Sequence, residues 1–220
     1  MLSKLDTVRK RLTSTVIGSE ESAYLMIVGL LSDGHILIQG APGIGKTTLA
    51  ETLATSIEGK FSRVQFTPDI LPADLLGYSI YNQGKEEFRF IEGPVFSNVL
   101  LADEINRTSP RIQSALLECM NERQVSIDGE TKKLSLPFMV IATQNNIHST
   151  GTFALPEPQL DRFMLSISMG VPNPEIQTKI LALHATNEVS STDATPIISL
   201  DEVLEFQSQV KSVFVSENIC

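Results

Sequence analysis

The residues with the clearest chemical potential lie in a glycine-rich segment that reads GAPGIGKT over residues 40–47. Glycines let the backbone turn tightly, so that several N–H groups point at one centre, and a helix starting there adds the positive end of its dipole. A lysine followed by a hydroxyl residue suits the β- and γ-phosphates and a magnesium ion. The sequence therefore predicts a polyphosphate site made by Gly40, Pro42, Gly43, Ile44, Gly45, Lys46, Thr47 and Thr48.

A second group of this kind is the acidic pair Asp103-Glu104, which follows the apolar run 99–102. Ligands of open parallel sheets bind beyond the carboxyl ends of the strands, which is where this pair would lie. We expect Asp103 to hold Mg²⁺ together with Thr47, and Glu104 to polarise an attacking water. Such a pair also begins many solvated loops, but the phosphate motif upstream favours the catalytic interpretation.

The elements that must position these residues alternate between strand-like and helix-like apolar periodicity, which is typical of an α/β domain. Five apolar segments predict buried strands, at 35–39, 63–66, 99–102, 138–142 and 164–167. Helices are expected at 5–12, 19–31, 47–57 and 109–120, with Ser19 and Ser109 as N-caps. Hairpins are expected at 78–91 and at 125–134, the second turning at Asp128-Gly129.

The pattern changes after residue 170, where Gly170 and two prolines precede a purely helical part. We therefore predict a nucleotide-binding αβα core at 1–170 and an incomplete all-α lid at 171–220. The lid helices are expected near 173–185 and 200–213.

Composition excludes several classes of protein. Of the 220 residues 42% are hydrophobic and 20% charged, as in a folded domain, and the net charge of −9 argues against a nucleic-acid-coating protein. Cys119 and Cys220 cannot make a disulfide framework or a four-ligand zinc site, and Cys119 is expected in the core. There is no signal-peptide pattern at the start, and the apolar stretch 23–31 is too short to span a membrane. We therefore expect a cytoplasmic protein.

Taken together, these motifs resemble the MoxR family of AAA-type (AAA+) ATPases. The resemblance covers residues 15–185 and rests on segments in the family's order: 40–47, 65–69, 92–96, 100–107, 121–125, 141–145 and 155–163. It implies a P-loop core with a parallel five-stranded sheet and hydrolysis of ATP with Mg²⁺.

The same resemblance implies roles for residues outside the two motifs. Ile17 and Gly18 would line the adenine pocket, and Asn145 would place its amide beside the γ-phosphate and the water. Arg162 would be an arginine finger in a neighbouring subunit's site, where a permanent positive charge meets the charge on the transferred phosphoryl group. Activity then requires a homo-oligomer, by family habit a hexameric ring. Such rings remodel or mature partner complexes, with adaptors that carry a von Willebrand A domain.

Members of that family carry a longer lid with a second sensor arginine, whereas Lys211 is the only basic residue after Leu200. This difference predicts impaired hydrolysis. Two other functions stay open from the sequence: a nucleotide-binding interaction module without turnover, and a DNA-dependent helicase-like motor. The acidic net charge disfavours the motor.

Overall fold

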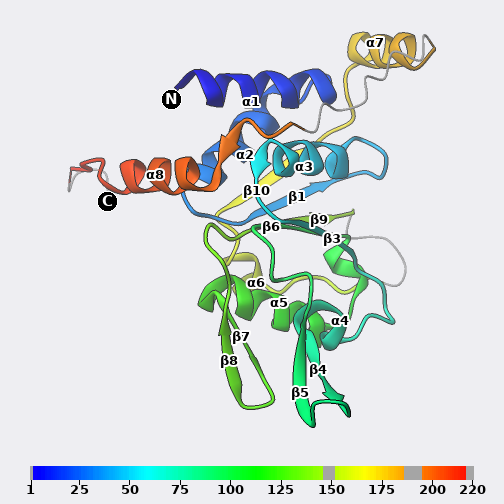
Figure 1. The fold of residues 1–220 in the computed structure, drawn as a ribbon. Coiled ribbons are helices and arrows are strands. Elements are labelled where there is room, and N and C mark those ends of the chain that lie inside the picture. The colour runs from blue at the N-terminus through cyan, green and yellow to red at the C-terminus, as the bar shows by residue number, and fades with distance from the viewer. Residues whose placement is uncertain (1, 146–151, 186–194, 217–220) are drawn as a thin grey trace.

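The computed structural model describes residues 2–145, 152–185 and 195–216. At its centre lies a sheet of five parallel strands in the order β10-β1-β9-β6-β3 (Figure 1). These strands are β1 (Ile36–Gly40), β3 (Phe61–Gln65), β6 (Val99–Asp103), β9 (Met139–Gln144) and β10 (Leu165–Met169). All five coincide with segments that the sequence predicts as strands. The prediction of an α/β fold with a five-stranded parallel sheet is therefore confirmed.

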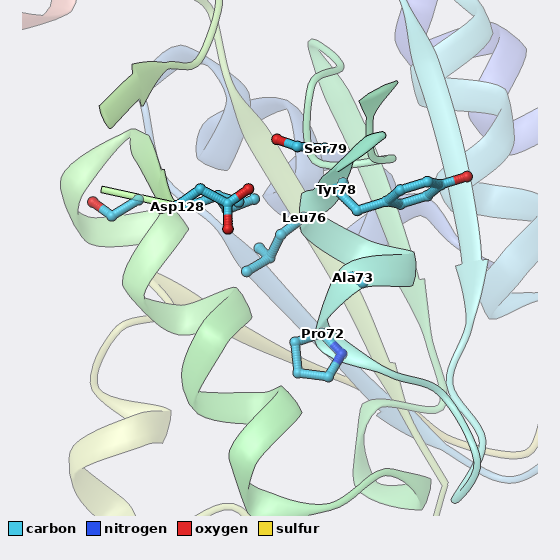
Figure 2. Close-up of a pocket in the computed structure, with 9 residues that line it drawn as sticks. Pro72, Ala73, Leu76, Tyr78, Ser79 and Asp128 are labelled. Atoms are coloured by element: carbon cyan, nitrogen blue, oxygen red, sulfur yellow. The ribbon is translucent and has the colours of Figure 1, made fainter. Parts of the chain in front are cut away.

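Two hairpins extend away from the sheet, and both are predicted by the sequence (Figure 1). They are β4 (Gly77–Asn82) with β5 (Glu87–Glu92), and β7 (Gln124–Ile127) with β8 (Glu130–Lys133). Asp128 and Gly129 have φ angles of 53° and 81°, the left-handed pair that a type I′ turn requires. A cleft of about 410 Å³ lies between the foot of the first hairpin, the helix α4 (Pro72–Leu76) and the tip of the second hairpin (Figure 2). It contains none of the residues predicted to bind phosphate.

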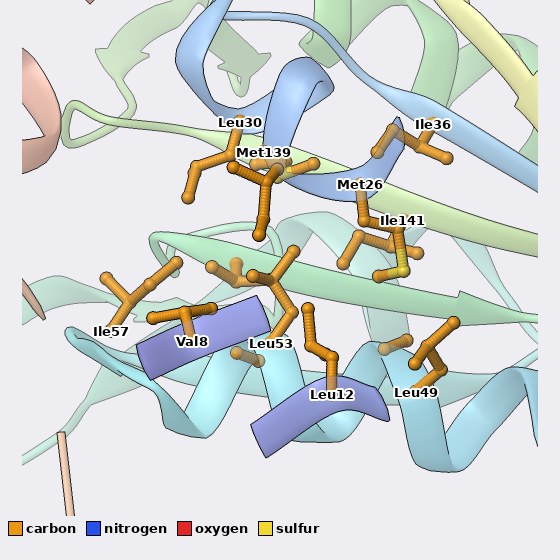
Figure 3. Packing of buried hydrophobic residues seen from close by; sticks show 14 of the residues in the cluster. Val8, Leu12, Met26, Leu30, Ile36, Leu49, Leu53, Ile57, Met139 and Ile141 are labelled. Carbon is orange, nitrogen blue, oxygen red and sulfur yellow. The ribbon is translucent and has the colours of Figure 1, made fainter. Parts of the chain in front are cut away.

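Helices cover both faces of the sheet, because each parallel crossover must leave the sheet and return. One face carries α1 (Leu2–Thr15), α2 (Glu20–Leu31), α3 (Lys46–Thr55) and α8 (Leu200–Lys211). Figure 3 shows the apolar cluster between these helices and the sheet. Side chains alternate along each strand, so Ile36 and Ile38 enter this cluster, whereas Leu37 between them enters the cluster on the opposite face.

The opposite face packs on α5 (Pro110–Glu122), with α4 and α6 (Glu157–Leu160) beside it (Figure 1). Cys119 is buried in this second cluster, as predicted. Burial raises the pKa of its thiol to about 12, so the side chain is a protonated core residue at neutral pH.

Two helix starts correct the sequence analysis in detail. Ser19 and Ser109 occupy the N-cap positions of α2 and α5, but neither side chain accepts a hydrogen bond from its helix. The Ser19 hydroxyl instead donates to the carbonyl oxygen of Val16 at 2.6 Å, which fixes the turn between α1 and α2. Among the residues that the structure describes, no helix combines the length and apolarity needed to cross a membrane.

The C-terminal part of the chain packs on the sheet face that carries α1, α2 and α3. The short strand β11 (Ile198–Ser199) pairs in parallel with β2 (Ile57–Glu58), and α8 follows it. Val203 and Phe206 of α8 are buried in the cluster formed by α1, α2 and α3. Helix α7 (Pro174–Ala185) lies at the end of α1 that leads into α2 (Figure 1). The division of the chain into a core at 1–170 and a lid at 171–220 stays a prediction. In the structure, α8 packs on the predicted nucleotide-binding part of the chain.

A buried histidine precedes β1 and contacts the second cluster. His35 accepts a hydrogen bond at Nδ1 from the Val140 N–H at 3.0 Å, so its Nε2 carries the proton and donates to the Met120 carbonyl oxygen at 3.1 Å. Burial lowers the pKa of His35 below its ordinary 6.5, and the hydrogen bond to Met120 only partly opposes this. Protonation would also place a second N–H against the Val140 N–H.

We expect this histidine to make the protein less stable in mild acid. Its pKa is lower in the folded state, so below pH 6.5 the unfolded chain binds the extra proton first. The free energy of unfolding should then fall with decreasing pH, with a slope of up to about 1.4 kcal/mol per pH unit. Urea unfolding between pH 7.5 and about 5 measures this slope. His35→Gln is the control, because it should remove part of the slope; equal slopes in both proteins would contradict the assignment.

Candidate functional site

The glycine-rich segment connects β1 to α3, as the sequence predicts. Gly43 and Gly45 have φ angles of 80° and 92°, in the left-handed region that favours glycine. At Gly40 a Cβ atom would lie 2.4 Å from the Met169 carbonyl oxygen, so a side chain there would push β1 away from β10. Helix α3 begins at Lys46 directly after this loop, and its first N–H groups have no partner within the helix. The loop therefore has the geometry of an anion site.

Lys46 lies inside this loop and is only 6% exposed. Its Nζ donates to the carbonyl oxygens of Gly40 and Ala41 at 2.8 and 2.7 Å, and to Oδ1 of Asn145 at 3.0 Å. Burial lowers the pKa of Lys46, while the negative charges of Asp103 and Glu104 oppose the shift. The ammonium group of Lys46 thus lies close to both carboxylates.

Asp103 and Glu104 stand at the carboxyl end of β6, beside the loop. The Thr47 hydroxyl lies 3.3 Å from Oδ1 and 3.2 Å from Oδ2 of Asp103, and the Thr143 hydroxyl donates to Oδ1 at 2.5 Å. Glu104 has a φ of 57°, and its N–H donates to the Thr143 hydroxyl at 2.9 Å. The two motifs, which lie far apart in the sequence, therefore form one site.

Asn145 connects the lysine to the glutamate. Its Oδ1 accepts from Lys46, and its Nδ2 donates to Oε1 of Glu104 at 2.5 Å. The residue directly follows β9, which lies between β1 and β6 in the sheet, and this strand order explains why one amide reaches both partners.

Two arginines contact the carboxylates of this site, and the sequence does not predict either of them as a site residue. Arg63 on β3 donates from Nη2 to Oδ2 of Asp103 at 2.8 Å and from Nη1 to Oε1 of Glu51 at 2.9 Å. Arg107 pairs with Oε2 of Glu104 at 2.9 Å. The sequence places Arg63 in a predicted strand. That placement points to Asp103 only once the strand order is known, because β3 pairs with β6, the strand that ends in Asp103.

The other predicted residues occupy two places. Residues 16–18 lie between the phosphate loop and α7: a Cβ at Gly45 would lie 3.0 Å from Val16, and one at Gly18 would lie 2.8 Å from Ile176. Val16 thus lies against the loop and Gly18 against α7, with Ile17 between them in the chain. Arg162 is exposed after α6, and the hydrogen bonds within the loop described above do not include it. Direct contacts therefore bring together Lys46, Thr47, Asp103, Glu104 and Asn145, and they do not include Arg162.

The donor atoms beside the loop fit a magnesium ion. Mg²⁺ prefers oxygen ligands and usually takes only one or two carboxylate or hydroxyl groups from the protein, the phosphates and water supplying the rest. The Thr47 hydroxyl suits such a direct contact, and the Asp103 carboxylate beside it suits a contact through a bound water. In the described part of the chain there is no cluster of three or more His, Cys, Asp or Glu able to hold a metal by itself.

Comparison with known proteins agrees with this geometry. Residues 35–165 match the profile of the ATPase family associated with various cellular activities (AAA). The uncharacterised protein YeaC of Bacillus subtilis is 42% identical over 210 residues, which are 96% of this chain and 65% of YeaC. A protein named chaperone MoxR1 from Mycobacterium tuberculosis is 46% identical over 200 residues, which are 91% of this chain and 52% of that protein.

A solved structure is similar over the same region. The crystal structure of a provisionally named ATPase from Cytophaga hutchinsonii aligns with a TM-score of 0.83 at 40% sequence identity, covering 99% of this chain and 66% of its own. The chain therefore spans between half and two thirds of the length of these relatives.

Proposed function

This chain belongs to the AAA family of ATPases, with proteins named MoxR among its relatives, and we propose that it binds ATP with Mg²⁺ and hydrolyses it. The observation that carries this proposal is the contact of Thr47 with Asp103, together with the contacts of Asn145 with Lys46 and Glu104. These contacts set a phosphate loop beside a carboxylate that can act on water.

Each residue has a distinct role in the proposed reaction. The loop N–H groups hold the phosphates at the start of α3, and Lys46 turns from its carbonyl partners to the β- and γ-phosphates. The Thr47 hydroxyl ligates Mg²⁺, and Asp103 holds it through water. When bound, Mg²⁺ neutralises charge on the phosphates.

Glu104 completes the site as the group that takes a proton from water. The water oxygen forms a bond to the γ-phosphorus, the bond from that phosphorus to the β–γ bridging oxygen breaks, and the water proton passes to Glu104. Asn145 holds the carboxylate through its Nδ2 and orients the water with its amide. Arg162 is exposed after α6, so its side chain is open to a neighbouring copy of the chain, which is consistent with its predicted place in that copy's site.

A ring is therefore part of the proposal, and subunit complementation tests it. Arg162→Ala should lower the ATPase rate on the order of 10³-fold while ATP binding persists, because the arginine acts only on the transition state. Lys46→Ala subunits bind ATP only weakly but still present Arg162. In rings mixed from equal amounts of the two inactive variants, the Arg162→Ala subunit supplies the intact phosphate site and the Lys46→Ala subunit supplies the arginine. About a quarter of the interfaces combine the two, so such rings should recover about a quarter of the parental rate.

The ATPase rate per subunit of the parental protein should also fall on dilution, because the site is complete only in the oligomer. Mixtures that stay inactive, together with a rate that does not change down to nanomolar protein, would contradict a ring with shared sites.

We further propose that turnover remodels or matures a partner protein complex, as the name of chaperone MoxR1 suggests for that relative. The β4–β5 hairpin supports this role, since Tyr81 and Phe88 are 52% and 75% exposed on its surface and exposed apolar groups favour protein contacts. Stimulation of the ATPase by single-stranded DNA would instead support the motor, and ATP binding without turnover would support the interaction module.

A further inference from the structure

We propose that Arg63 is a positioning residue that sets the affinity of the nucleotide complex for Mg²⁺ by sharing the carboxylate of Asp103. The proposal rests on the proposed function, because it concerns the metal that accompanies the nucleotide. Its starting point is the ion pair between Nη2 of Arg63 and Oδ2 of Asp103, 2.8 Å long.

The hydrogen bonds of Asp103 leave little room for a direct metal contact. Its Oδ1 accepts from Thr143 at 2.5 Å and its Oδ2 accepts from Arg63, while the Thr47 hydroxyl lies 3.2 Å from Oδ2. The side chain of Asp103 is only 8% exposed, so the charge is screened weakly by solvent. Asp103 can therefore serve Mg²⁺ through a bound water while Arg63 keeps its position.

The guanidinium also offsets the charge that attracts the metal. A positive charge in contact with Asp103 reduces the net attraction of the site for a divalent cation. In the absence of metal, the same charge reduces the repulsion between Asp103 and the phosphates. Arg63 therefore stabilises the metal-free nucleotide complex relative to the metal-loaded one.

Arg63 is held in this position from a second side. Its Nη1 pairs with Glu51 of α3 at 2.9 Å, and the Arg63 side chain is 45% exposed, so it can be substituted without opening the core. The two ends of one guanidinium thus contact the metal-site carboxylate of Asp103 and the carboxylate of Glu51 on α3. This arrangement supplies a matched pair of variants.

The test measures the dissociation constant of ADP by titration calorimetry, once with Mg²⁺ and once with EDTA. Linkage makes the ratio of the EDTA value to the Mg²⁺ value a measure of Mg²⁺ affinity, with no turnover involved. Arg63→Gln should raise this ratio about fivefold, as a half-exposed ion pair allows, and Arg63→Lys should stay near the parental ratio. Glu51→Gln should not raise it, because it leaves the charge on Asp103 paired.

Three outcomes overturn the inference: an unchanged or lower ratio in Arg63→Gln, an equal rise in Glu51→Gln, or a rise in Arg63→Lys equal to that in Arg63→Gln. The last two indicate that Arg63 acts only by holding β3 and α3 together. If the parental protein does not bind ADP even with Mg²⁺, the proposed function fails instead, so the two failures are distinguishable.

Discussion

Replacement of Lys46 by alanine is expected to weaken ATP binding by about 10²–10⁴-fold, the loss of two charge-assisted hydrogen bonds to phosphate. The effect is large because Lys46 is buried and its charge has no substitute inside the loop. Binding of a fluorescent ATP analogue to the Lys46→Ala protein, in the presence of Mg²⁺, measures the loss.

A second variant separates charge from packing. Lys46→Met keeps the length of the side chain but removes its charge, so it should bind ATP as poorly as Lys46→Ala. Both variants also leave the carbonyl oxygens of Gly40 and Ala41 without their Lys46 partner, so thermal melting should accompany the titration. ATP affinity equal to that of the parental protein would remove Lys46 from the phosphate site.

Glu104→Gln should lower the rate of phosphate release by about 10²–10⁴-fold, the usual contribution of a general base. ATP affinity should stay within a few-fold, because no phosphate contact is assigned to Glu104. The glutamine has the same shape and can still contact Asn145, so the change removes the charge that pairs with Arg107 and the proton acceptor. Phosphate release at saturating ATP, together with an ATP titration, gives the two values.

Glu118→Gln provides the control, since Glu118 is exposed on α5 and does not belong to the site. It should release phosphate at the parental rate. If Glu104→Gln also turns over at the parental rate, Glu104 does not act on the water.

The strands and the two motifs could be predicted because each depends on local sequence. A run such as 99–102 is apolar at every position, which identifies a strand buried on both faces, and the phosphate loop follows from spacing alone. Arg63 shows what local sequence lacks. Its strand was predictable, but its contact with Asp103 depends on the order of strands in the sheet, which no local pattern encodes.

Helix α8 and the short elements show two further limits. The apolar side of α8 predicts burial without saying what covers it, and the structure buries Val203 and Phe206 on the first core. The short helix α4 and the single turn η1 (Ile105–Arg107) contain too few residues to show a period. The role of Lys46 at phosphate stays a prediction, and its bonds to Gly40 and Ala41 could not be foreseen because they depend on the loop conformation.

The bonds of Lys46 to its own loop show how the phosphate loop pairs its buried charge with protein atoms. A line of donors and acceptors runs from the Gly40 carbonyl through Lys46, Asn145 and Glu104 to Arg107, so the interior charges are balanced by protein atoms alone. In the proposed function, an incoming nucleotide replaces the protein partners of Lys46 by its phosphates. In the proposed reaction, release of product lets Lys46 return to these protein partners, so that its buried charge is again paired.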